Sequence, residues 1–258
     1  MGSGRQRRTW YKKHLRRQRW QAAKPWLLGT LIGLVVILVG AYAFAPRTPA
    51  PVADDSPRPV RSAEAKKHVP VVAFIGDSYT AGAGTTKLSR SWVERLARSQ
   101  GWEAHNFGRG GTGYANGVAG GTAQIACGLD YCPSYIEMIP EAADVSPDIV
   151  IVAGGRNEAT QPGATQSANI DAFFQELAAQ LPDAQVIAVN PLWDDDETPE
   201  AVADMSGMVE RSVESTGGRF LDIGQPLLGE PGFVAEDGAH PNDDGHKAIA
   251  EATSAALP

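Results

Sequence analysis

From residue 69 onward, short apolar runs alternate with longer amphipathic stretches. The apolar runs are rich in β-branched residues and have Gly, Pro or Asp at or near their ends, which is typical of buried strands. Three runs are clear and two are weaker: 71–75, 149–153 and 185–189, then 102–107 and 219–223. The stretches between them have apolar residues at helical spacing or lie beside turn residues, and they predict helices at residues 88–100, 169–181, 199–215 and 243–256.

This order of elements predicts one α/β domain over residues 69–258. When strands and helices alternate, right-handed crossovers place the strands side by side and parallel, with helices on both faces. We therefore expect a three-layer α/β/α sandwich with a mainly parallel five-stranded sheet, similar to the flavodoxin-like arrangement. Such sheets carry their chemistry in the loops after the carboxyl ends of the strands, so site residues are expected there.

The N-terminal part of the chain follows a different pattern. Residues 26–45 contain no charged residue and are mostly Leu, Ile, Val, Gly and Ala. Twenty residues in a helix span about 30 Å, which is the thickness of a bilayer core. Residues 1–24 contain nine Lys or Arg and no acidic residue. The pattern predicts a cytoplasmic basic tail at 1–24, a transmembrane helix at 25–45 that acts as a signal anchor, and an extracytoplasmic remainder.

Two alternatives also export the C-terminal domain. Residues 41–43 and 43–45 both have the small-residue pattern of a signal-peptide cleavage site. Pro46 disfavours cleavage after residue 45, so the first site is the alternative. Residues 7–12 weakly resemble a twin-arginine export signal. All three interpretations place the domain outside the cytoplasm, and cleavage of a signal peptide would make it a secreted protein.

The composition of the middle and C-terminal parts narrows the function. Residues 46–68 contain five prolines among Ala, Ser, Asp and Arg, which predicts a disordered linker between membrane and domain. The whole chain has a net charge of −7, but residues 69–258 hold 27 acidic and nine basic residues. Such an acidic domain has no electrostatic means of holding a phosphate backbone, which argues against binding of nucleic acid.

Two segments at opposite ends of the domain contain candidate catalytic residues. Ser78 follows the first predicted strand in the triplet Gly-Asp-Ser, and a serine at a strand-to-helix turn exposes its hydroxyl at the sheet edge. Taken alone, such a triplet is more often a turn or a helix cap. Asp237 and His240 lie three residues apart before the last helix. This spacing lets the carboxylate accept a hydrogen bond from Nδ1 and leaves Nε2 as a base.

Two further segments contain candidate oxyanion donors. Residues 106–114 are rich in glycine, which lets backbone N–H groups point at a substrate. The stretch includes a literal G-x-G-x-x-G, but it follows the second strand rather than the first, which disfavours a dinucleotide site. Asn157 lies in the loop after the strand predicted at residues 149–153, and its side-chain amide can donate to the same oxyanion of the substrate. The alternative is an asparagine of an ordinary loop.

In this order the four segments resemble the SGNH or GDSL esterase family, and the resemblance covers about residues 69–256. It implies that Ser78 is the nucleophile, His240 the general base and Asp237 its orienting carboxylate, and that Ser78, Gly111 and Asn157 form the oxyanion hole. The family's third segment usually ends in Asp, whereas Glu158 follows Asn157 in this chain.

The resemblance also implies an activity. We expect a carboxylic ester hydrolase that works through an acyl-enzyme, without a cofactor or metal, on a short O-acyl ester of a cell-envelope or extracellular glycan or a related small ester. A short acyl group is favoured because no loop resembles a large lipid-binding cap. The alternatives are an O-acyltransferase that uses the same residues and a catalytically silent envelope-binding module.

Cys127 and Cys132 are the only cysteines of the chain. In an oxidising compartment a close isolated pair predicts a disulfide that pins a surface loop. A metal site is disfavoured because no His or further Cys lies close in sequence.

The remaining charged residues near these segments have weaker signals. The acidic residues 194–197 predict a solvated loop before a helix, which we prefer to a calcium site because spaced oxygen ligands are missing. His246 lies in the last predicted helix and is expected to pack or cap. Arg109 and Arg156 fall within the site segments and are candidates to contact an anionic or sugar-like substrate.

Overall fold

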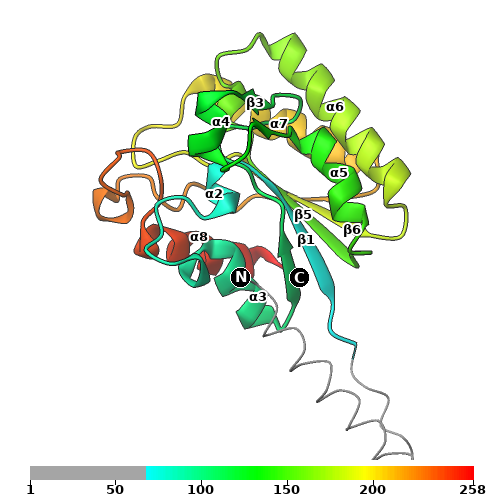
Figure 1. The fold of residues 1–258 in the computed structure, drawn as a ribbon, viewed down its shortest axis with the longest axis horizontal. Helices are drawn as coiled ribbons and strands as arrows, with labels where there is room; N and C mark the ends of the chain where they lie inside the picture. Colours follow the sequence, from blue (N-terminus) through cyan, green and yellow to red (C-terminus); the bar gives the residue numbers. More distant parts are fainter. Residues whose placement is uncertain (1–67) are drawn as a thin grey trace, which may run out of the picture. The chain divides into compact units, whose positions relative to one another are not determined.

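The computed structural model describes residues 68–258 (Figure 1). The basic tail predicted at 1–24, the transmembrane helix predicted at 25–45 and the linker predicted at 46–68 lie outside the described residues, except for His68. Within residues 68–258, no helix is long and apolar enough to span a bilayer.

Five parallel strands form the central sheet, which confirms the predicted sheet. In the order in which they lie side by side they are β2 (Glu103–Asn106), β1 (Val71–Gly76), β5 (Ile149–Ala153), β6 (Gln185–Val189) and β7 (Arg219–Leu221). All four neighbouring pairs are parallel. The chain first moves from β1 to one side and then returns to its other side at β5. The loops after β1 and β5 therefore diverge, and this is where an open α/β sheet holds its ligands.

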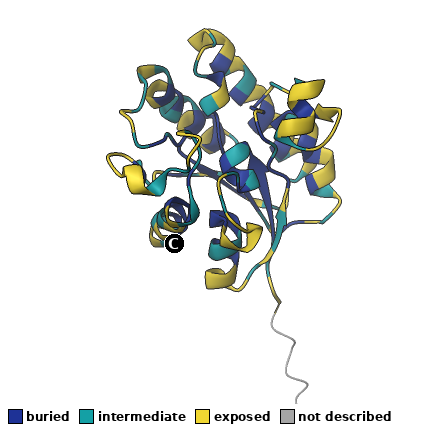
Figure 2. Ribbon diagram, turned by 60° about the vertical axis from the view of Figure 1, so that its left-hand side comes forward, coloured by how far each residue is buried: buried dark blue, intermediate teal, exposed yellow. Residues whose placement is uncertain are grey.

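Helices cover both faces of the sheet, as the three-layer prediction requires. Helices α5 (Tyr135–Ala143), α6 (Gly163–Gln180) and α7 (Glu200–Ser215) lie on one face, and α3 (Trp92–Gln100) and α8 (Asp243–Ala256) lie on the other (Figure 1). Each face has its own apolar core, one around Tyr114 and Phe173 and one around Phe74 and Trp92. The three central strands β1, β5 and β6 are almost wholly buried (Figure 2), whereas the edge strands β2 and β7 are partly exposed.

Short helices occur in the connecting loops. They are α2 (Ser78–Ala81) and the 3₁₀ helices Leu88–Arg90, Arg156–Glu158 and Pro231–Phe233. The helix predicted at residues 88–100 is therefore wrong at its start. Ser91 interrupts it, because its hydroxyl accepts a hydrogen bond from the backbone N–H of Glu94 at 3.3 Å and caps α3.

Helix α5 was not predicted from the sequence. It begins at a capping box in which the Ser134 hydroxyl and backbone N–H both lie within hydrogen-bond distance of the Glu137 carboxylate. Pro140 lies inside this helix, and the sequence pattern does not indicate a helix here because proline normally marks a helix end. Met138 and Ile139 of this helix are fully buried in the apolar core, which stabilises it.

A small unit of two short strands and one short helix follows the glycine-rich loop. It consists of β3 (Val118–Ala119), α4 (Gly121–Ala126) and β4 (Tyr131–Cys132), with β3 and β4 antiparallel. The predicted disulfide joins Cys127 to Cys132 and closes this unit. The unit packs closely on the glycine-rich loop, because a Cβ on Gly110 would lie 2.5 Å from the carbonyl oxygen of Ala126.

Candidate active site

Ser78 begins α2, directly after the buried strand β1. The buried Asp77 caps this helix, because its carboxylate accepts a hydrogen bond from the backbone N–H of Tyr79 at 2.9 Å. The hydroxyl of Thr80 donates to the carbonyl of Ala153 at 2.8 Å and ties α2 to the end of β5. Burial raises the pKa of Asp77 to about 6. Ser78 itself is half-buried and lies at the carboxyl edge of the sheet.

Asp237 and His240 form a pair on the loop before α8. Nδ1 of His240 lies 2.7 Å from Oδ2 of Asp237. The backbone N–H groups of Ala239 and His240 both donate to Oδ1 of the same carboxylate at 3.0 Å. These hydrogen bonds, that of the His240 side chain foremost, lower the pKa of Asp237 to about 2. The carboxylate is therefore charged at neutral pH and stabilises a proton on Nδ1 of His240.

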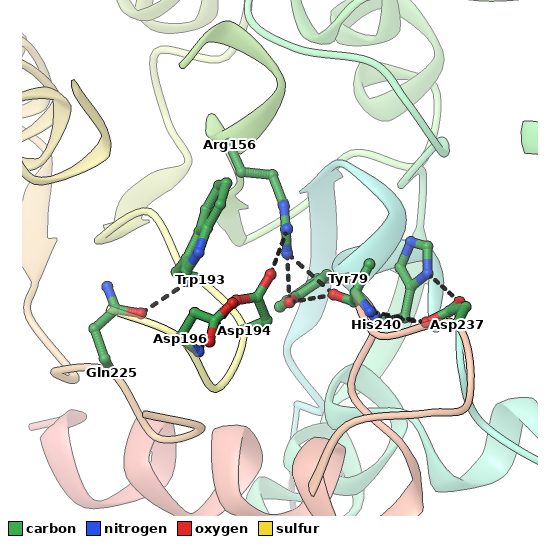
Figure 3. Close-up of polar contacts among 9 residues, drawn as sticks. Tyr79, Arg156, Trp193, Asp194, Asp196, Gln225, Asp237 and His240 are labelled. Carbon is green, nitrogen blue, oxygen red and sulfur yellow. Dashed lines mark hydrogen bonds and ion pairs between the residues drawn. The ribbon is translucent and has the colours of Figure 1, made fainter. Parts of the chain in front are cut away.

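Tyr79 joins the two ends of the domain at this edge. Its hydroxyl donates a hydrogen bond of 2.7 Å to the carbonyl of Ala239, and its ring centroid lies 6.1 Å from that of His240 (Figure 3). The residue after Ser78 is thus bonded to the residue before His240. Within the described chain, no hydrogen bond connects the Ser78 hydroxyl to the His240 ring. Such bonds are often long without substrate and tighten when it binds.

Gly111 and Asn157 come from adjacent loops that contact each other. The side-chain amide of Asn157 donates to the carbonyl of Thr112 at 2.8 Å. Gly111 has φ +74°, a left-handed conformation that favours glycine. Asn106 holds the same loop against α2, because its amide donates to the carbonyl of Thr80 at 2.7 Å. The structure therefore holds the start of the predicted oxyanion loop against α2 and joins Asn157 to the same loop at Thr112.

Glu158 occupies a buried position beneath the glycine-rich loop. Its carboxyl takes the place that a side chain on Gly113 would need, since a Cβ there would lie 1.7 Å from Oε1. This space explains how the chain accommodates Glu where the family usually has Asp. Glu158 is 1% exposed, and neither carboxyl oxygen has a hydrogen-bond partner of normal geometry. Burial raises its pKa to about 7, and the nearby Asp77 acts in the same direction.

The two arginines of the site segments are engaged by carboxylates of the protein. Nη2 of Arg109 lies 3.4 Å from Oε2 of Glu141. Nη2 of Arg156 lies 3.0 Å from Oδ2 of Asp194. The prediction of a solvated loop at residues 194–197 is therefore wrong for Asp194, which is buried. No spacing along the chain indicates this contact, because the two residues lie in different loops.

The other weak candidates have structural explanations. Within residues 68–258, no group of three or more His, Cys, Asp or Glu side chains could hold a metal ion. His246 is fully buried, and its Nε2 lies 2.9 Å from the carbonyl oxygen of Ala83. Burial lowers the pKa of His246 to about 4, so it is neutral at pH 7 and packs as predicted.

Comparison with known proteins identifies the family. The profile of the GDSL-like Lipase/Acylhydrolase family matches residues 74–248, most of the described chain. The chain belongs to this family. Membership of the GDSL-like lipase/acylhydrolase family makes the protein a carboxylic ester hydrolase and confirms the resemblance seen in the four sequence segments.

Individual relatives of this GDSL-family hydrolase are distant. GDSL lipase Rv0518 of Mycobacterium tuberculosis is 24% identical over 229 residues, which cover 86% of this chain and 93% of the relative. The esterase EstA of a Pseudoalteromonas species has the same fold, with a TM-score of 0.56 at 14% identity, over 72% of this chain and 96% of its own. A family two carbohydrate esterase of Cellvibrio japonicus has a TM-score of 0.54 at 15% identity, over 73% of this chain and 61% of its own.

Proposed function

We propose that this GDSL-family hydrolase is an extracytoplasmic serine esterase that removes a short O-acyl group through Ser78, His240 and Asp237. One observation carries the proposal. Tyr79, the residue after Ser78, donates a hydrogen bond to the carbonyl of Ala239, which lies in the loop of the hydrogen-bonded pair Asp237 and His240. This contact supports the assignment of His240 as the base for Ser78, because it links the loop of His240 to the helix that Ser78 begins.

The reaction would proceed through a covalent acyl-enzyme. Oγ of Ser78 attacks the ester carbonyl carbon while its proton passes to Nε2 of His240. The protonated His240 then donates this proton to the leaving alcohol, and the acyl group remains on Ser78. A water molecule, deprotonated by His240, attacks the acyl carbon and releases the acid and Ser78. The charged Asp237 stabilises the imidazolium in both steps.

The oxyanion would be held by three donors: the backbone N–H groups of Ser78 and Gly111 and the side-chain amide of Asn157. The Asn157 amide has two N–H groups, and only one is needed for the hydrogen bond to Thr112. Each donor of this kind typically contributes about 2.7–4 kcal/mol to lowering the barrier.

Two features support an extracytoplasmic location. The disulfide between Cys127 and Cys132 is of a kind that persists in oxidising compartments. The basic residues at 1–24, followed by the apolar run at 26–45, favour an N-terminal membrane anchor that leaves the hydrolase domain outside.

The proposed substrate is an O-acylated glycan of the cell envelope, or a related small ester. The proposed acyl group is short, because no segment of the sequence resembles a large apolar cap for a long chain. That a carbohydrate esterase shares the fold is compatible with a glycan ester. Transfer of the acyl group to another hydroxyl would use the same residues and differs only in whether water reaches the acyl-enzyme.

An acyl-length series with the full chain tests the proposal. We expect p-nitrophenyl acetate to give a higher kcat/KM than p-nitrophenyl laurate, and Ser78→Ala to abolish both activities without loss of the fold. Release of free acetate that is unchanged by added glycans supports hydrolysis, whereas acetylated glycan would reveal a transferase. Undiminished turnover by Ser78→Ala would reject the assignment of the nucleophile.

A further inference from the structure

Arg156 lies at the centre of the loops that surround the proposed catalytic residues. It belongs to the 3₁₀ helix Arg156–Glu158 after β5, and its side chain is 14% exposed. The guanidinium lies between two aromatic rings, with its central carbon 4.9 Å from the ring centroid of Tyr79 and 4.3 Å from that of Trp193 (Figure 3). Cation–π attraction therefore acts on the guanidinium from both rings.

The edges of the guanidinium are also engaged. Nη2 donates to Oδ2 of Asp194 at 3.0 Å. Nη1 donates to the carbonyl of Ala239 at 3.2 Å and to the hydroxyl of Tyr79. Because Asp194 is itself buried, the ion pair is screened little by solvent and fixes the orientation of the fork. One side chain therefore connects the loop after β6, the loop before α8 and the helix of Ser78.

The contact with Ala239 bears directly on the proposed base. The carbonyl of Ala239 belongs to the peptide bond that continues into His240, and it accepts hydrogen bonds from both Arg156 and Tyr79. The pair of Asp237 and His240 lies within one loop. What the local pair cannot set is the distance from His240 to Ser78, since these residues belong to different segments.

We propose that Arg156 is a positioning residue that holds the loop of His240 against the helix of Ser78, and that it does not bind substrate. The inference rests on the proposed function of Ser78 and His240. Its physical basis is the planar fork of arginine, which satisfies a carboxylate and a carbonyl at once. A substrate anion would have to displace Asp194 from a buried ion pair to reach the guanidinium.

The test replaces Arg156 with Lys in the full chain, which keeps the charge but not the fork. We expect kcat for p-nitrophenyl acetate to fall at least tenfold with KM changed less than about threefold, because a small misplacement of a catalytic group lowers the rate and not the binding. The rate at which a fluorophosphonate labels Ser78 should fall in parallel. The NMR signal of the Nδ1 proton of His240 should persist, because the pair with Asp237 stays intact.

A matched control is Arg98→Lys. Arg98 also connects a backbone carbonyl, that of Ser89, with a carboxylate, that of Glu94, but it lies on α3 away from the site. This variant should keep the wild-type kcat. If Arg156→Lys does not fold, Tyr79→Phe removes only the hydroxyl that bonds Ala239 and should lower kcat and the labelling rate in the same way, by about threefold or more.

The outcomes separate this inference from the proposed function. A wild-type kcat in Arg156→Lys, in a protein that Ser78→Ala inactivates, would overturn only the role of Arg156. A raised KM that appears for p-nitrophenyl hemisuccinate but not for p-nitrophenyl acetate, with kcat unchanged, would also overturn it and make Arg156 a substrate-binding residue. Turnover that survives Ser78→Ala contradicts the proposed function itself.

Discussion

The carboxylate of Asp237 accepts a hydrogen bond from Nδ1 of His240 across 2.7 Å, within a segment of only four residues. Two backbone N–H groups of the same segment fix the other carboxylate oxygen. The loop is therefore built around this carboxylate, which stays ionised at any pH well above 2. All of these hydrogen bonds lie within one loop.

Replacing Asp237 by Asn should remove the negative charge and allow the other tautomer of His240. We expect kcat for p-nitrophenyl acetate to fall by roughly 10²–10⁴-fold, the usual contribution of a general base, with a small change in KM. Steady-state kinetics at pH 7.5 measure it. Glu236→Gln is the matched control, since it removes one exposed charge from the adjacent position. Equal activity of the two variants would exclude Asp237 from the mechanism.

Replacing Glu158 by Gln should stabilise the protein at alkaline pH. The folded protein keeps the Glu158 proton up to about pH 7, whereas the unfolded chain releases it near 4.5. The contribution of Glu158 to the free energy of unfolding is therefore highest below about pH 4.5 and falls as pH rises to about 7. Gln has no such proton to lose, so Glu158→Gln should gain roughly 2–3 kcal/mol over wild type at pH 8 and little at pH 5.

Urea unfolding of both proteins at pH 5 and pH 8 measures this difference. Asp77 contributes a change of the same sign between about pH 4 and 6, but it is present in both proteins and cancels. Glu176→Gln, an exposed substitution on α6, should behave as wild type at both pH values. A lower stability of Glu158→Gln at pH 8 would show that the buried carboxylate is stabilised by a partner.

Removing the disulfide with Cys127→Ser and Cys132→Ser should lower the free energy of unfolding by about 2 kcal/mol, the chain-entropy value for so short a loop. Reductant should lower the stability of the wild-type protein to a similar level and leave the double variant unchanged. Guanidinium unfolding with and without dithiothreitol provides the measurement. A wild-type protein that is insensitive to reductant while its disulfide is reduced would contradict this role.

The central strands could be predicted from the sequence because buried strands consist of continuous runs of apolar residues. Residues 149–153 and 185–189 lie between two helical layers, so nearly every side chain is apolar, and both strands have the predicted limits. Helix starts were harder. The first residues of α6 are small and polar, and its N-terminal part, from Gly163, was missed because these residues face solvent or other loops.

The site could be predicted only where spacing in the chain carries the signal. Asp237 and His240 are three residues apart, and Ser78 begins a recognisable segment. Arg156 and Asp194 are 38 residues apart, and nothing along the chain marks their ion pair, because it depends on two loops that meet only in the folded sheet. The burial of Glu158 depends likewise on the missing side chain of Gly113.

Mass spectrometry of the full chain after reaction with a fluorophosphonate tests the central claim most directly. Wild type should gain one phosphonyl group on the peptide that contains Ser78, Ser78→Ala should gain none, and His240→Ala should react about 100-fold more slowly because it has lost its base. A covalent group on any other residue, or equal labelling of Ser78→Ala, would contradict the assignment of this serine and histidine.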